Sequence, residues 1–147
     1  MKNKKFVPGI TDIVLIVVSL GYLVLLNTVF ITCGPKDDGS FMVCQWAWRS
    51  LVVLAVILVT LSIVHAFVPG NELRLGISIG IFTVAIASAV LPDNIIPLCM
   101  MNTMKCHTHT KPGNLVFSVL IAVASAVDIA VRIRKLTVKA VKQQEEI

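Results

Sequence analysis

Four long runs of apolar residues, separated by short polar segments, dominate the chain. The runs cover about residues 10–32, 50–69, 73–92 and 115–131. A bilayer core about 30 Å thick needs roughly 20 apolar residues per helix, so each run is close to the length that crosses it. Unsatisfied backbone groups are costly in lipid, so each run is expected to be a helix. The pattern predicts an all-α fold, a four-helix transmembrane bundle.

The segments between the runs carry turn residues and charges. The first, from Cys33 to Arg49, contains Gly34-Pro35 and a charged turn, and the third spans residues 93–114 with Pro97 and Pro112. The second is the short stretch 70–72, and a basic tail covers residues 132–147. The four helices and the tail use nearly all of residues 1–147, so a single transmembrane domain is expected.

The composition excludes an ordinary soluble protein. Of the 147 residues, 56% are hydrophobic and only 14% are charged, against roughly 25% charged residues in a typical soluble domain. The net charge of +5 does not indicate nucleic acid, because the basic residues flank the apolar runs instead of forming a patch. The first run lacks a small-residue cleavage site and is interpreted as a retained anchor. The expected surroundings are a lipid bilayer.

The distribution of basic residues predicts the orientation. Nine lysines and arginines lie on one side of the predicted bundle, in the N-terminus, near the second connection and in the tail, and four lie on the other. The nine are Lys2, Lys4, Lys5, Arg74, Arg132, Arg134, Lys135, Lys139 and Lys142, and the four are Lys36, Arg49, Lys105 and Lys111. By the positive-inside rule, both termini are expected to be cytoplasmic, in a multi-pass protein of the cytoplasmic membrane.

The two halves of the chain resemble one another. Met42-Val43-Cys44-Gln45 stands before the second predicted helix, and Met104-Lys105-Cys106-His107 stands before the fourth. A second cysteine precedes each segment. This arrangement predicts two helical hairpins in the same orientation, related as parallel repeats.

All four cysteines fall in the two predicted outer loops. Outside the reducing cytosol paired thiols oxidise, so two disulfides are expected. Cys33 with Cys44 and Cys99 with Cys106 would each brace one loop, while cross-loop pairing remains an alternative because four cysteines allow three connectivities. A second interpretation is a quinone-linked thiol-disulfide oxidoreductase. Neither pair has the C-x-x-C spacing that typically activates a thiol, so no enzymatic activity is expected.

The third connection is rich in soft metal ligands. Met100, Met101, Met104, His107 and His109 lie within eleven residues that also include two cysteines. Thioethers select Cu(I), and imidazole suits copper or zinc, so a copper site or a haem-handling role is a third interpretation. Oxidised cysteines cannot ligate a metal. The preferred expectation is that no cofactor binds, neither copper nor quinone.

A few ionisable residues fall inside or beside the apolar runs. Asp128 and Arg132 are spaced to pair on one face of the fourth helix, and Asp12 and His65 lie at a similar depth near the inner boundary. Such residues are candidates for function in membranes. Interfacial anchoring is the preferred interpretation, and a proton relay is the alternative.

Small residues recur at helix-packing intervals on the third and fourth helices. They are Gly76 and Gly80 on the third, and Ser118, Ala122, Ala126 and Ala130 on the fourth. Small residues four apart let helix backbones approach closely in lipid. They predict packing within the bundle, or docking of a larger membrane partner.

The cysteine segments carry a resemblance. Met42-x-Cys44 followed by Gln45-Trp46 and Arg49, together with Cys99-Met100, Met104-x-Cys106 and Pro112, is similar to a family of small prokaryotic four-helix membrane proteins of unknown function. The chain departs from that pattern at Gln45, where the family usually has His, and has His107 after the last cysteine. The resemblance implies no assigned activity, and it implies association with ABC-type permeases.

The sequence therefore favours a non-enzymatic accessory or structural subunit of a larger, transporter-like membrane assembly. Its partner is expected to be a larger membrane protein such as an ABC-type permease, or a second copy of the chain. No Walker-type motif indicates energy coupling by this chain alone.

Overall fold

The computed structural model describes residues 9–30, 39–41, 43–97 and 106–145. Four long helices form the fold: α1 (Ile10–Thr28), α2 (Val43–Phe67), α3 (Asn71–Val90) and α4 (Lys111–Glu145). Two short π-helical turns, η1 (Leu91–Ile95) and η2 (Cys106–Thr110), follow α3 and precede α4. All four long helices are long and apolar enough to cross a membrane. The predicted four-helix transmembrane fold is confirmed at this level.

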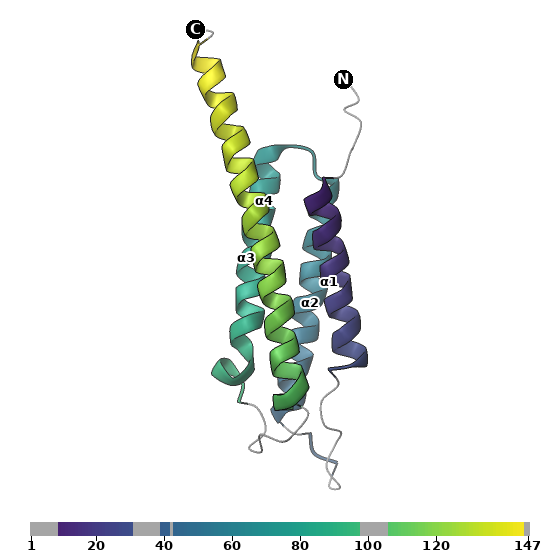
Figure 1. The fold of residues 1–147 in the computed structure, drawn as a ribbon. Helices are drawn as coiled ribbons and strands as arrows, with labels where there is room; N and C mark the ends of the chain where they lie inside the picture. Colours follow the sequence, from purple (N-terminus) through teal and green to yellow (C-terminus); the bar gives the residue numbers. More distant parts are fainter. Residues whose placement is uncertain (1–8, 31–38, 42, 98–105, 146–147) are drawn as a thin grey trace.

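The helices run up and down beside one another in one bundle. Helix α1 begins and α4 ends at the same end, where the short α2–α3 connection also lies (Figure 1). We call this the termini end, and the opposite end the loop end. Around the bundle α1 packs on α2, α2 on α3, α3 on α4, and α4 returns to α1, with the α3–α4 interface the most extensive. Each half of the chain is one helical hairpin that turns at the loop end.

Helix α2 begins at Val43, earlier than the apolar run that predicted it. Contact with lipid requires apolar residues only within the bilayer core, and a helix can continue beyond that core. The Trp48 indole Nε1 donates to the Leu26 carbonyl of α1 at 2.8 Å, and the Arg49 guanidinium lies 5.2 Å from the Phe41 ring centroid. Residues 43–49, expected in a loop, are therefore the first turns of α2, docked on the end of α1.

Helix α4 extends past the predicted span in both directions. Pro112 is its second residue, where the missing amide hydrogen is not needed. No glycine or proline occurs after Gly113, so nothing in the sequence interrupts the helix, and it runs to Glu145. The basic segment expected as a tail is helical over most of its length and projects beyond the bundle at the termini end (Figure 1).

A three-residue connection turns the chain between α2 and α3. Gly70 has a φ of 114°, a backbone conformation that residues with a Cβ rarely adopt. The Gly70 carbonyl accepts the Arg74 amide at 3.2 Å, which closes the first turn of α3. This tight turn sets α2 and α3 side by side and brings their ends to the same level.

The bundle is apolar outside as well as inside. Its apolar core consists of Leu15, Tyr22, Leu26, Phe30, Leu51, Ala55, Leu58, Ile81, Ala85 and Ile121. The outward positions are largely Val, Ile and Leu, whereas several Ser, Asp and His side chains are buried. A surface of this kind is expected against lipid, where outward apolar groups are well solvated and polar groups gather inside. The apolar outer surface of the helices therefore indicates that a lipid bilayer surrounds the bundle.

Candidate functional site

The ionisable residues of the apolar runs lie inside the bundle at its termini end. Asp12 and His65 are fully buried, and Asp128 is 2% exposed. Their interpretation as interfacial anchors was wrong, because each occupies the helix face that points at the other helices. Their positions near the ends of the apolar runs indicate the membrane boundary. The rotation of each helix about its axis, which the sequence does not show, turns these side chains into the core.

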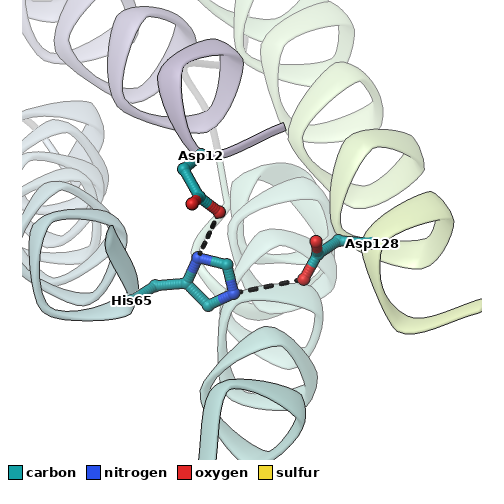
Figure 2. A group of neighbouring side chains, drawn as sticks. All are labelled: Asp12, His65 and Asp128. Carbon is teal, nitrogen blue, oxygen red and sulfur yellow. Dashed lines mark hydrogen bonds and ion pairs between the residues drawn. The ribbon is translucent and has the colours of Figure 1, made fainter. Parts of the chain in front are cut away.

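His65 of α2 lies between carboxylates of two other helices, as Figure 2 shows. Its Nδ1 is 3.2 Å from Asp12 Oδ1 of α1, and its Nε2 is 3.1 Å from Asp128 Oδ2 of α4. The Nδ1 contact is at ion-pair distance but is not aligned as a hydrogen bond. One imidazole ring thus connects α1, α2 and α4.

Two arginines complete the charges around His65. Arg132 Nε donates to Asp128 Oδ2 at 2.6 Å, one turn away on α4, and its Nη2 lies 3.5 Å from Asp12 Oδ1. Arg74 of α3 places Nη1 3.2 Å from Asp12 Oδ2. Arg132 is 7% exposed, and the Arg74 side chain is 15% exposed. Both guanidinium groups therefore face inward to the carboxylates.

Local helix chemistry holds each of these side chains in place. Asp12 is the third residue of α1, and its Oδ2 accepts the Gly9 amide at 3.0 Å, an arrangement that favours a carboxylate at a helix start. Arg74 donates to the carbonyls of Val68 and Ala66 at 2.6 and 2.9 Å, which caps the end of α2. The same side chains that cap the start of α1 and the end of α2 therefore belong to the site, and the capping contacts fix their orientation.

Two hydroxyl groups donate further hydrogen bonds to Asp128. Ser78 Oγ donates to Asp128 Oδ2 at 2.6 Å and lies 3.0 Å from His65 Nε2, and Thr11 Oγ1 donates to Asp128 Oδ1 at 3.2 Å. We call the whole set the ion-pair cluster: Thr11, Asp12, His65, Arg74, Ser78, Asp128 and Arg132. It draws on all four long helices.

The charges of the ion-pair cluster balance. Two carboxylates face two guanidinium groups, so the formal charges cancel when His65 is neutral. Ligand atoms of Asp12, His65 and Asp128 lie within 4.8 Å of one another, the separation of a metal site. A divalent cation would compete with both guanidinium groups for the carboxylates and leave an uncompensated charge in the bilayer. The donor set therefore fits a proton better than a metal.

The predicted disulfides have only one member each in the described part of the chain. Cys44 and Cys106 are fully buried near the loop end and are not joined to one another by a disulfide. Cys33 and Cys99 lie outside the described residues, so both pairings stay predictions.

The predicted metal ligands are likewise divided. His107 and His109 lie on η2, half-buried and exposed respectively. Met100, Met101 and Met104 lie outside the described residues. Among the His, Cys, Asp and Glu side chains of the described ranges, ligand atoms converge at Asp12, His65 and Asp128, at the opposite end of the bundle.

The small residues on α3 and α4 lie on different faces. A side chain built at Gly76 or Gly80 would meet nothing within 4 Å, so this face of α3 is not covered by the described bundle. On α4 the residues drift outward along the helix: Ser118 is buried, Ala122 half-buried, and Ala126 and Ala130 exposed. Only the first of that set lies in the core.

The sequence marks four members of the cluster as candidates and predicts one contact among them, the pair of Asp128 and Arg132, which the structure contains. It indicates Arg74 only as a basic residue near the second connection, and it gives no role to Ser78 or Thr11. A signal was present, because Arg74 and Ser78 are four residues apart in an apolar helix, the same spacing as Asp128 and Arg132. Two such pairs, each near the same end of the predicted bundle, indicate that the third and fourth helices face one another through polar side chains.

Comparison with known proteins gives a family for this chain. No curated protein and no solved structure matches it. The family match covers residues 15–131, which includes His65, Arg74, Ser78 and Asp128 but ends just short of Asp12 and Arg132. The chain belongs to the family described as a domain of unknown function (DUF4418).

Proposed function

We propose that this protein is a non-enzymatic four-helix membrane subunit that binds and releases a proton at the ion-pair cluster. The observation that carries the proposal is the position of His65, whose two ring nitrogens lie 3.2 and 3.1 Å from carboxylate oxygens of Asp12 and Asp128. Those carboxylates come from α1 and α4, so the protonation of one ring bears on the contact among three helices.

Hydrogen-bond stoichiometry explains why the arrangement suits proton exchange. A neutral imidazole has one N–H, but two carboxylates face it, so only one of them receives a hydrogen bond. A second proton places an N–H near each carboxylate and adds one positive charge to a cluster that is otherwise balanced. A proton accepted at one ring nitrogen can therefore be followed by loss of the proton at the other. The remaining charged groups facing the ring are Arg74 and Arg132, which hold the carboxylates in place.

The described cysteines support a non-enzymatic role. A reactive thiol is normally accessible and lies in an electropositive environment. Cys44 and Cys106 are both 0% exposed, which is typical of cysteines with a structural role. We propose that no cofactor is needed and that disulfides in the loops, where they form, act as braces.

Nitrogen NMR of the histidines tests proton binding. In lipid nanodiscs, protein labelled with ¹⁵N-histidine and carrying His107→Gln and His109→Gln retains only His65. The ring signals should change reversibly from two protonated nitrogens to one as the proton concentration of the buffer is lowered. A ring that keeps one protonation state throughout would refute the proposal. Full-length protein with His65→Gln assigns the signals.

A second proposal concerns the partner. We propose that the chain accompanies a larger membrane protein such as an ABC-type permease, or a second copy, in a prokaryotic cytoplasmic membrane with both termini inside. The uncovered Gly76 and Gly80 on α3 support it, because small residues gain nothing against lipid but allow a further helix to approach. Co-purification in mild detergent should retain a membrane partner with wild type and lose it with Gly76→Ile and Gly80→Ile. Equal retention by both proteins would contradict this.

A further inference from the structure

Buried polar side chains extend well beyond the ion-pair cluster, along the interior face of α4. Its inward positions, together with the end of η2, are occupied by Thr110, Asn114, Ser118, Ile121, Ser125, Asp128 and Arg132, all buried. Ile121 is the single apolar member of that series. A transmembrane helix with a polar inward face over about 33 Å of its length is expected to line a path or a cavity.

Partners on the other helices follow the same face. Near the loop end, the Tyr22 hydroxyl of α1 donates to Asn114 Oδ1, and Asn114 Nδ2 donates to the Ser88 carbonyl of α3 at 2.8 Å. In the middle, Ser19 Oγ of α1 lies 3.2 Å from Ser62 Oγ of α2. These side chains are buried, so the contacts lie inside the bundle.

The polar groups follow one another at intervals of about one helical turn. Ser19 precedes Tyr22 by three residues on α1, and Ser62 precedes His65 by three on α2, about 4.5 Å along each helix axis. The Ser19–Ser62 contact therefore connects the Tyr22 level to the His65 level. We call this series the polar column: Thr110, Asn114, Tyr22, Ser118, Ser19, Ser62 and His65. Polar groups too far apart for a direct hydrogen bond can be joined by a bridging water.

Two hydroxyls in the column have no hydrogen-bond partner among the described residues. They are Ser118 Oγ and Thr110 Oγ1, both buried. Other serines of the bundle satisfy themselves by donating to a carbonyl of the preceding turn, as Ser62 does to Leu58 at 2.8 Å. Buried polar atoms are almost always satisfied, and ordered water is the usual partner when protein groups are not.

We propose that the polar column, with bound water, conducts protons between the loop end and the ion-pair cluster. The inference rests on proton exchange at His65 and adds a route to the other face of the membrane. In each step a water or hydroxyl oxygen accepts a proton and gives another to the next oxygen. One O–H bond forms as another breaks, so nothing is oxidised or reduced and the net change is one proton moved.

Proton flux into vesicles tests the route. Full-length protein is reconstituted in K⁺-loaded vesicles with a trapped pH dye and valinomycin, so that potassium movement compensates the charge. Wild type should equilibrate a pH step faster than protein-free vesicles, and Ser19→Ala with Ser62→Ala should return to the protein-free rate. The matched control is Thr60→Ala with Thr83→Ala, which removes two lipid-facing hydroxyls and should keep the wild-type rate.

The outcomes separate this proposal from the previous one. Wild-type flux equal to that of protein-free vesicles, or full flux in the Ser19 and Ser62 variant, would overturn conduction while the His65 NMR result stands. If the double serine variant does not fold, Tyr22→Phe replaces it, since this change removes one hydroxyl and keeps the stacking of the ring on Phe117. Conduction requires Tyr22→Phe to slow the flux, and an unchanged rate would refute it.

Discussion

Gly113 shows how a single missing side chain determines the packing at the loop end. The Phe30 ring, which follows α1, lies directly over Gly113 near the start of α4, and a Cβ built there would overlap the ring. Phe30 is 8% exposed and belongs to the apolar core. The contact of Phe30 with the start of α4 therefore requires a glycine at this position, for a packing reason and not for a backbone one.

Gly113→Ala is expected to destabilise the bundle by about 1–3 kcal/mol, because Phe30 must move out of its packed position. Gly76→Ala and Gly80→Ala are matched controls, since a Cβ at either position meets nothing within 4 Å. Unfolding of the purified proteins in mixed detergent micelles measures the difference. Equal stability of all three variants would show that the Phe30 contact does not constrain the bundle.

Arg74 links three helices, of which α2 and α3 are joined in the chain by a three-residue turn. Its guanidinium donates to two carbonyls at the end of α2 and to Asp12 at the start of α1, while its backbone belongs to α3. The planar group has donors in fixed directions, which suits three acceptors at once. The end of one helix and the start of another are thereby held by a side chain of a third.

Arg74→Lys should lower the free energy of unfolding by about 2 kcal/mol, because one ammonium group cannot reach all three acceptors. Arg134→Lys on the exposed part of α4 is the matched control and should change stability little. Thermal unfolding in detergent followed by circular dichroism compares them. Indistinguishable melting of the two variants would mean that the charge of Arg74 suffices without its geometry.

The two ends of the bundle differ. Four membrane-crossing helices have three connections between them, so the two chain termini lie at the same end. The α1 start, the α2–α3 turn and the α4 end share one end (Figure 1), so Arg74 and the basic residues of the last turns of α4 lie there. The ion-pair cluster lies at this same end. The positive-inside rule predicts that the end of the bundle with the ion-pair cluster lies on the cytoplasmic side.

Thiol labelling in intact cells tests that orientation. With a membrane-impermeant reagent, Lys36→Cys should label above the wild-type background, and Lys142→Cys should label only after the cells are permeabilised. The two sites lie in segments predicted on opposite sides. Labelling of both in intact cells would contradict the topology, and labelling of Lys142→Cys alone would place the ion-pair cluster on the outer side.

The sequence by itself determined the number and approximate place of the helices. Crossing a bilayer imposes a length and an apolar composition on each helix, and both are legible in the chain without knowledge of neighbours. It did not determine where the helices end. Residues 43–49 and 132–145 lie outside the apolar runs and are nevertheless helical, because neither segment contains a proline or glycine that would interrupt the backbone hydrogen bonds.

The tertiary structure decided what the ionisable residues face. Asp12, His65 and Asp128 are far apart in sequence. Apolar residues lie on every side of α1 and α2, so hydrophobic periodicity did not mark the faces of Asp12 and His65 as interior. Their burial follows from the rotation of each helix and from pairing with Arg74 and Arg132. In lipid the apolar faces are nearly interchangeable, so the few polar contacts select which face turns inward, and those contacts exist only once the helices have packed.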